Sequence, residues 1–196
     1  MAAEKWLVVG LGNPGPVYSH NRHNVGYWSV NRLARLHGIP LKARRLATIG
    51  EGSIAGVPVL LAKPRTFVNR SGHAVAALLR NFRIKPDQML VICDDLDLPT
   101  GRLRLRPGGG HGGQKGLRSI IGTIGSAGFP RLRIGIGRPL VDGEPSWEPD
   151  VVAVYVLSDP TPQEAESLQA AAAEAAEAVE AVLREGVEAA MNRYNR

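Results

Sequence analysis

The chain has 196 residues, of which 44% are hydrophobic and 21% are charged, as in a globular protein with one sizeable core. It contains no apolar run of ~18 residues, and its first segment resembles a buried strand rather than a signal peptide, so we expect an intracellular, cytoplasmic protein without a membrane span. The single cysteine, Cys93, excludes an internal disulfide and a cysteine metal cluster.

Charge is distributed unevenly along the chain. Residues 1–139 contain 21 lysines and arginines against 6 acidic residues, whereas residues 140–196 contain 3 against 12. Nineteen of the 24 cationic residues are arginine, whose planar guanidinium suits bidentate contact with phosphate. The basic part therefore predicts a nucleic acid partner. A general preference for arginine, as in a thermostable protein or a GC-rich genome, is an alternative that composition leaves open.

The first unit of the chain is predicted to be strand, loop and helix. Lys5–Gly10 is a short apolar run closed by glycine, which is typical of a buried strand. A loop rich in Gly, Pro, Asn and His follows up to Gly26 and is a candidate site, because loops after the strands of an open α/β sheet carry ligands. Helical spacing then begins at Asn24 and ends at His37 and Gly38.

The middle of the chain reads as further strands and one helix. Two or three short strands are expected in residues 41–64, over 41–49, 53–56 and 57–64, with Gly50, Gly52 and Gly56 as turn signals. A polar junction at 66–71 precedes a helix over Gly72–Phe82, and Pro86 and Asp87 make a turn. Met89–Cys93 then predicts a central strand that ends on Asp94, Asp95 and Asp97.

Two arginine-bearing strands follow. Arg102–Arg106 alternates strictly, so its three arginines share one face that must be solvated or bound to anions, and Arg131–Gly137 places Arg131 and Arg133 together on one face. Between these strands, Pro107–Gly116 is rich in glycine and is predicted to be a mobile loop, and a helix follows through 117–124.

The last third of the chain is mostly helical. Residues 138–150 form a polar connection, and Val151–Leu157 fits either a strand or a helix. Thr161 and Glu164 form a capping box with Pro162 at the first helical position, which predicts a long C-terminal helix over about 161–184 and a final turn over 187–196. The fold class expected is a single α/β domain over 1–196, with a twisted, mixed, largely parallel sheet flanked by helices.

Several kinds of chemistry can be weighed on the residues alone. Gly10–Gly15 matches the dinucleotide-binding glycine pattern, but Pro14 and Pro16 block the helix that would receive a pyrophosphate, and no acidic residue lies between Glu4 and Glu51 to bind a ribose. No cofactor is therefore expected. The five histidines lack zinc spacing, so no metal is expected either.

Polar side chains near strand ends suggest general base catalysis. Four polar clusters end or interrupt the apolar segments: Asn13, His20/His23/Asn24, Asn69 and Asp94/Asp95. If the strands share a sheet, three of these clusters can converge, so that a carboxylate orients a histidine, which activates water while amides bind the carbonyl oxygen. A solvent-facing role is the alternative for any one histidine. Covalent catalysis is disfavoured, because Cys93 lies inside an apolar strand and Ser71 lacks a nucleophile elbow.

A set of spaced motifs resembles the bacterial peptidyl-tRNA hydrolase family. They are GLGNPG at 10–15 with Tyr18, Arg22-His23-Asn24 and Gly26, then Phe67-x-Asn69-x-Ser71-Gly72, residues 94–101, residues 109–113 and residues 131–137. The resemblance implies hydrolysis of the ester that joins a peptide to the terminal ribose of tRNA, which recycles tRNA from aborted translation. It also implies a monomer.

The resemblance assigns roles residue by residue. His23 matches the catalytic base, Asp94 its supporting carboxylate, and Asn13 the residue that separates N-blocked from free aminoacyl-tRNA. The substrate crevice would be lined by Tyr18, Phe67 and Asn69, with Asn69 holding peptide backbone or the attacking water, and phosphate would be clamped by Arg106 and Arg133.

The chain also departs from the family pattern. Lys115 stands where many members have Asn, and its ammonium could reach the tRNA backbone or polarise a carbonyl. Asn21 replaces a usual Thr, and His20 adds a second candidate base. An RNA-binding protein on the same fold without hydrolytic activity is the alternative function.

Overall fold

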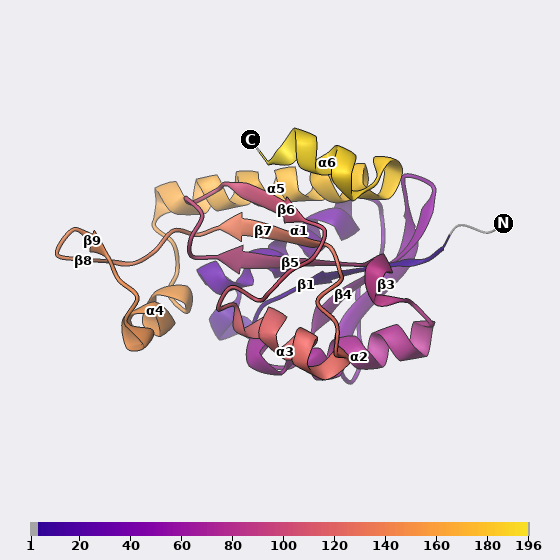
Figure 1. Ribbon diagram of the computed structural model, residues 1–196, viewed down its shortest axis with the longest axis horizontal. Coiled ribbons are helices and arrows are strands. Elements are labelled where there is room, and N and C mark those ends of the chain that lie inside the picture. The colour runs from indigo at the N-terminus through magenta and orange to yellow at the C-terminus, as the bar shows by residue number, and fades with distance from the viewer. Residues whose placement is uncertain (1–3, 196) are drawn as a thin grey trace.

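The protein, described by a computed structural model over residues 4–195, is built around one seven-stranded sheet with helices on both faces (Figure 1). The strands are β1 (Trp6–Gly10), β2 (Lys42–Ala43), β3 (Ala47–Ile54), β4 (Val57–Pro64), β5 (Met89–Asp95), β6 (Leu103–Arg106) and β7 (Arg131–Gly135), with β8 (Leu140–Val141) and β9 (Glu144–Pro145) forming a separate hairpin. The helices are α1 (Val25–Leu36), α2 (Ser71–Phe82), α3 (Lys115–Ile124), α4 (Pro149–Val156), α5 (Pro162–Glu185) and α6 (Val187–Tyr194).

The sheet has a parallel centre and antiparallel flanks. Its order is β2-β3-β4-β1-β5-β7-β6, in which β4, β1, β5 and β7 run parallel and β2, β3 and β6 pair antiparallel with their neighbours. The expected mixed α/β fold with a long C-terminal helix is confirmed. Because the central strands are parallel, their carboxyl ends lie at the same edge of the sheet.

Alternation along the central strands fills two separate cores. Val8, Leu90 and Ile92 face α1 and α5 on one side of the sheet, whereas Leu7, Val9 and Val91 face α2 and α3 on the other. These central strands are therefore apolar on both faces, as a parallel sheet covered by two helical layers requires. In Figure 1, α5 and α6 lie above the sheet and α2 and α3 lie below it, and α1 packs against α5.

The prediction that Gly50 and Gly52 mark turns was wrong. Both lie inside β3, which ends at Ile54 and so includes only the first two residues of the strand predicted over 53–56, and the chain reverses at Ala55 and Gly56. A Cβ at Gly50 would lie 2.8 Å from the side chain of Ile39, and one at Gly52 would lie 2.6 Å from it. The two glycines therefore make room for Ile39 on the sheet. The strand expected over 41–49 is likewise interrupted, since β2 covers only Lys42–Ala43.

The C-terminal third is more regular than the sequence indicated. The connection at 138–150 contains the β8-β9 hairpin, the ambiguous segment at 151–157 is mostly the helix α4, and the final turn is the helix α6. Thr161 and Glu164 form the predicted capping box of α5. The predicted domain and final turn also include residues 1–3 and 196, which lie outside the described residues. Over residues 4–195, no helix has both the length and the apolar character needed to cross a bilayer.

Candidate active site

A pocket of about 420 Å³ lies at the carboxyl ends of the parallel strands. The loop after β1 supplies Asn13, the 3-10 helix η2 (Arg22–Asn24) supplies His23, the 3-10 helix η3 (Val68–Arg70) supplies Asn69, and the end of β5 supplies Asp94. The four residues predicted to act together therefore line one cavity. This is the edge at which open α/β sheets bind ligands.

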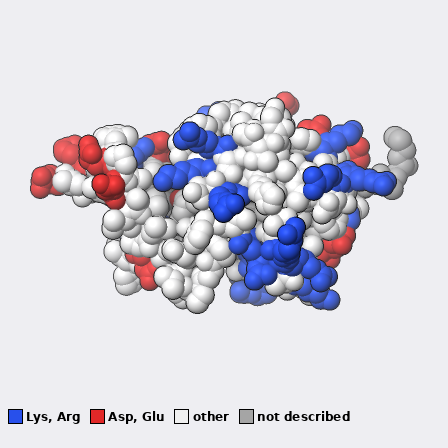
Figure 2. Space-filling view, turned by 90° about the horizontal axis from the view of Figure 1, so that it is seen from below, with Lys and Arg blue, Asp and Glu red and all other residues white. Residues whose placement is uncertain are grey.

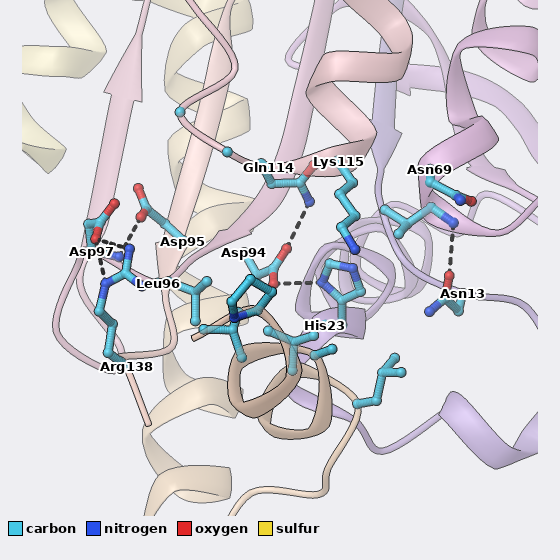
Figure 3. A pocket seen from close by; sticks show the side chains of 18 of the residues that line it. Asn13, His23, Asn69, Asp94, Asp95, Leu96, Asp97, Gln114, Lys115 and Arg138 are labelled. Atoms are coloured by element: carbon cyan, nitrogen blue, oxygen red, sulfur yellow. Dashed lines mark hydrogen bonds and ion pairs between the residues drawn. The ribbon is translucent and has the colours of Figure 1, made fainter. Parts of the chain in front are cut away.

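His23 and Asp94 form a buried pair at the centre of this pocket (Figure 3). Nδ1 of His23 lies 2.6 Å from Oδ2 of Asp94, and the two side chains are only 9% and 4% exposed. Because Asp94 engages Nδ1, Nε2 is the ring nitrogen left to exchange a proton with a molecule in the pocket.

The protonation of His23 is set by competing effects. Burial lowers the pKa of the His23 imidazole, but the charge of Asp94 and its hydrogen bond raise it, and the net pKa lies above the ordinary value of 6.5. The charge of Lys115 acts in the opposite direction and lowers the pKa of His23. The ring therefore carries a proton more readily than an isolated histidine, and Lys115 limits this preference.

Gln114 holds the second oxygen of Asp94. Its Nε2 donates to Oδ1 of Asp94 over 2.9 Å, while its Oε1 accepts a hydrogen bond from Leu117 N at the start of α3. One side chain thus caps α3 and fixes the carboxylate that contacts His23. The sequence analysis missed this residue; its position just before a helix signalled a cap, but nothing in the sequence connected it to Asp94.

Asn13 is fixed by a network of amide contacts. The side chain of Asn24 accepts from Asn13 N and donates to Asn13 O, both over 2.9 Å, and the backbone N–H of Val68 donates to Asn13 Oδ1 over 2.8 Å. The side-chain oxygen is therefore occupied, and the nitrogen Nδ2 is the group that Asn13 presents to the pocket (Figure 3). Asn69, which is exposed, lines the pocket beyond Val68.

Lys115 begins α3 and lines the same pocket. Its side chain extends toward His23 in Figure 3. An ammonium at a helix N-terminus is unfavourable, because the helix dipole is positive there. Within residues 4–195, no carboxylate forms an ion pair with Lys115. The start of α3 therefore directs positive charge at the pocket.

Two further walls are largely apolar. Tyr18 and Phe67 pack edge to face with ring centroids 6.1 Å apart, and Phe67 is 54% exposed at the mouth. The facing wall comes from α4 and the residue after it, through Val152, Val156 and Leu157, which the sequence analysis did not assign to a site. His20 is exposed and is absent from the lining residues, so the second candidate base lies outside the pocket.

The arginines of β6 and β7 divide into two groups. Arg133 lines the pocket, with its Nε 3.0 Å from Oδ2 of Asp95, and Arg106 is exposed near the opposite end of this strand pair. Arg131, in contrast, is 2% exposed and donates to four backbone carbonyls, those of Gly109, Gly110, Ala127 and Phe129. It is a structural residue, not part of an anion-binding face.

Charge is also separated in space. In Figure 2, which views the molecule from the side of α2 and α3, acidic residues gather at the end where Figure 1 places β8-β9 and α4. Lysines and arginines spread over the middle and the other end. Among residues 4–195, no group of three or more His, Cys, Asp or Glu side chains could hold a metal ion.

Arg22 connects the histidine turn to the C-terminal helix. Its guanidinium donates to Ser158 Oγ over 2.6 Å and to Glu164 Oε2 over 2.5 Å, and it lies 4.3 Å from the ring centroid of Tyr155. The residue before His23 therefore anchors the junction of α4 and α5. This positioning role was also missed, because it depends on residues more than a hundred positions away.

Comparisons with known proteins agree on one family. The family model described as Peptidyl-tRNA hydrolase matches residues 7–196. Curated peptidyl-tRNA hydrolases from Chloroflexus aggregans and Desulforudis audaxviator are 50% and 46% identical, over 97% and 96% of this chain and 98% and 92% of their own lengths. The crystal structure of peptidyl-tRNA hydrolase from Acinetobacter baumannii has 38% identity and a TM-score of 0.90, covering 100% of this chain and 96% of that one.

Proposed function

Because the chain belongs to the peptidyl-tRNA hydrolase family and is an ester hydrolase acting on peptidyl-tRNA, we propose that His23 is the general base of the reaction. The observation that carries this proposal is the 2.6 Å contact between His23 and Asp94 in a pocket that Asn13 also lines. Asp94 keeps the ring oriented and stabilises its protonated form, so that Nε2 can accept a proton from water.

The reaction then proceeds without a covalent intermediate. Water loses a proton to His23 Nε2 as its oxygen attacks the ester carbonyl carbon, which gives a tetrahedral intermediate with negative charge on the former carbonyl oxygen. When that intermediate collapses, the bond to the ribose oxygen breaks and His23 returns the proton to this oxygen. The products are a tRNA with a free terminal hydroxyl group and a peptide carboxylic acid, which releases its proton to solvent.

Donors in the pocket would stabilise the developing charge. Lys115 extends toward His23, so we assign its ammonium to the ester carbonyl oxygen rather than to the tRNA backbone. The free Nδ2 of Asn13 would donate to the substrate next to the ester and favour N-blocked peptidyl groups. Asn69 would hold the peptide backbone or the attacking water, and Tyr18 and Phe67 would contact the peptide.

The tRNA is assigned to the basic side of the pocket. Arg133 and Arg106 would contact phosphates near the acceptor end, because both lie on the strand pair that borders the pocket and neither is fully buried. We further propose that the chain acts as one domain and as a monomer in the cytoplasm, where translation supplies the substrate, without a metal ion or an organic cofactor.

The decisive experiment compares ester cleavage with RNA binding. His23→Ala should abolish release of the acyl group from N-acetyl-aminoacyl-tRNA while its affinity for tRNA is retained, and His20→Ala should remain active. Undiminished turnover by His23→Ala would remove His23 from the role. Absence of turnover in the unmodified protein, with tight RNA binding, would instead support the non-catalytic alternative. The unmodified protein should cleave N-blocked substrate faster than free aminoacyl-tRNA.

A further inference from the structure

A second cavity adjoins the active site. Its volume is about 390 Å³, and Asn13 lines both cavities. The loop that carries Asn13 separates them, and the second cavity continues between α1 and the ends of β3 and β4. It therefore opens at the same edge of the sheet as the active site, and the mechanism proposed above makes no use of it.

The side chain of Lys63 carries an uncompensated charge in this cavity. Its Nζ donates to Asn31 Oδ1 over 2.7 Å and lies 5.5 Å from the ring centroid of Tyr27, so both neighbours are neutral. Burial lowers the pKa of Lys63. Over residues 4–195, no carboxylate pairs with it, and none of the described residues that line the cavity is acidic. A partly desolvated cation without a counterion favours binding of an anion.

The other groups that line the second cavity indicate which kind of molecule would carry the anion. Arg65 adds a second cation at the exposed side of the cavity, and Thr48 adds a hydroxyl group. Tyr27 and Trp28 add aromatic surface, and the Trp28 indole N–H donates to Ser19 O over 2.8 Å, which fixes the ring. Cationic groups beside aromatic rings are the combination that binds the phosphate and the base of a nucleotide.

We propose that this second cavity binds a nucleotide, with its phosphate on Lys63 and Arg65. Two sources can supply this chemistry: a nucleotide of the acceptor end of the bound tRNA, or a free mononucleotide. The first source rests on the hydrolase function, because it requires the ester to occupy the neighbouring pocket; the second does not.

The sharpest variant is Asn31→Asp. The new carboxylate would occupy the position of an amide oxygen that is already 2.7 Å from Lys63 Nζ, so it would supply an internal counterion without changing the size of the cavity. Lys63→Met removes the charge directly. Gln163→Glu is the matched control, since it makes the same amide-to-acid change at an exposed position of α5.

The probe is AMP, titrated into the protein while the indole ¹⁵N–¹H resonance of Trp28 is followed by NMR. We expect a saturable shift of the Trp28 resonance with AMP and little effect of adenosine. The dissociation constant for AMP should be about tenfold or more larger in Asn31→Asp and Lys63→Met, and it should be unchanged in Gln163→Glu. No saturable shift, equal binding of adenosine, or unchanged affinity in Asn31→Asp would each overturn the proposal.

Kinetics with N-acetyl-aminoacyl-tRNA then identify the source. If the substrate fills the cavity, Asn31→Asp raises KM with little change in kcat, and AMP competes with the substrate. If KM is unchanged and AMP does not compete, the site serves free nucleotides. Because the AMP titration requires no turnover, its result is independent of whether His23 performs the proposed catalysis.

Discussion

Gln114 donates to Oδ1 of Asp94 over 2.9 Å, so the carboxylate that contacts His23 through Oδ2 is held at both oxygens. Because Gln114 is also the N-cap of α3, the helix that presents Lys115 is connected directly to the His23–Asp94 pair. The orientation of the imidazole and the position of the nearby ammonium therefore depend on one amide side chain.

Gln114→Asn separates these two functions. Asparagine is a good N-cap residue, so α3 should remain capped, but its side chain is one methylene shorter and cannot also reach Asp94. We expect kcat to fall about 10-fold to 100-fold, as for loss of a hydrogen bond to a charged group, with little change in the free energy of unfolding. Single-turnover cleavage and urea unfolding measure the two quantities. A variant with full activity would show that the contact with Asp94 has no catalytic consequence.

Removal of the Lys115 charge should change the pH dependence of hydrolysis. In the proposed mechanism the neutral form of His23 is the base, so kcat/KM should rise as pH passes upward through the pKa of His23. Lys115 lowers that pKa. Lys115→Met should therefore move the midpoint of the rise to higher pH and, through loss of the carbonyl contact, reduce the plateau about 100-fold. Lys115→Arg keeps the charge and should keep the midpoint.

The stability of the protein should follow the opposite pH trend at this site. The folded pKa of His23 is raised above 6.5, so the contribution of the protonated His23–Asp94 pair to the free energy of unfolding is fully present below that pH and is lost as pH rises through the folded pKa.

For the kinetic prediction on Lys115, an identical pH–rate midpoint in Lys115→Met and the unmodified protein would contradict the electrostatic role of Lys115.

Arg106 and Arg133 should account for part of the salt dependence of tRNA binding. Each phosphate contact releases counterions, so replacing both arginines by alanine should weaken binding and reduce the slope of log K against log salt by about 2. Arg184→Ala, at an exposed position near the end of α5, serves as the control for general loss of charge. An unchanged slope in the double variant would exclude the two arginines as phosphate ligands.

Arg131 should behave differently from its neighbours. Arg131→Met leaves the carbonyls of Gly109, Gly110, Ala127 and Phe129 without the donors that this arginine provides. We expect the free energy of unfolding to fall by about 3 kcal/mol, with the salt dependence of tRNA binding unchanged. Arg131→Lys should not restore stability, because an ammonium cannot reproduce the planar set of donors. Urea unfolding of both variants tests this, and a stable Arg131→Met would contradict the structural role.

These arginines show where the sequence was informative and where it was not. Strict alternation predicted one shared face for the arginines of Arg102–Arg106, and the residues between them, Leu103 and Leu105, are buried in the structure. It also predicted one shared face for Arg131 and Arg133. Burial of Arg131 depends on carbonyls at 109–110 and 127–129, which a pattern in five consecutive residues does not contain. Gly50 and Gly52 were misinterpreted for the same reason, since Ile39 packs on them from another segment.

The contact between His23 and Asp94 was more accessible to prediction. Asp94 and the loop after β1 follow parallel strands, and the carboxyl ends of such strands meet at one edge of the sheet. His23 and Asp94 are 71 residues apart, and their contact follows from this topology. The motifs of the family resemblance selected His23 over His20, a choice that periodicity alone left open. Gln114 and Arg22 had no such signal, because their partners are set by side-chain directions in the folded chain.

Gly26 allows the start of α1, directly after the turn that carries His23, to pack closely on the sheet. It lies at the start of α1, directly after η2, and a Cβ there would lie 2.5 Å from Ile92 O and 2.6 Å from Leu11 O. These contacts are with the backbones of β5 and the segment after β1, which cannot rotate away as a side chain can. Gly26→Ala must therefore displace the start of α1, and with it the histidine.

We expect Gly26→Ala to lower the free energy of unfolding by about 2 kcal/mol and to lower kcat about 100-fold, since a misplacement of about 1 Å has that effect on a catalytic group. Gly122→Ala is the matched control, because that glycine lies within α3 with open space around its Cβ position and should gain about 0.5 to 1 kcal/mol from helix propensity. Urea unfolding and single-turnover cleavage of both variants measure the effects. If Gly26→Ala retained wild-type kcat, the close approach of α1 to the sheet would not be what positions His23, and the anchoring of η2 by Arg22 would have to do so alone.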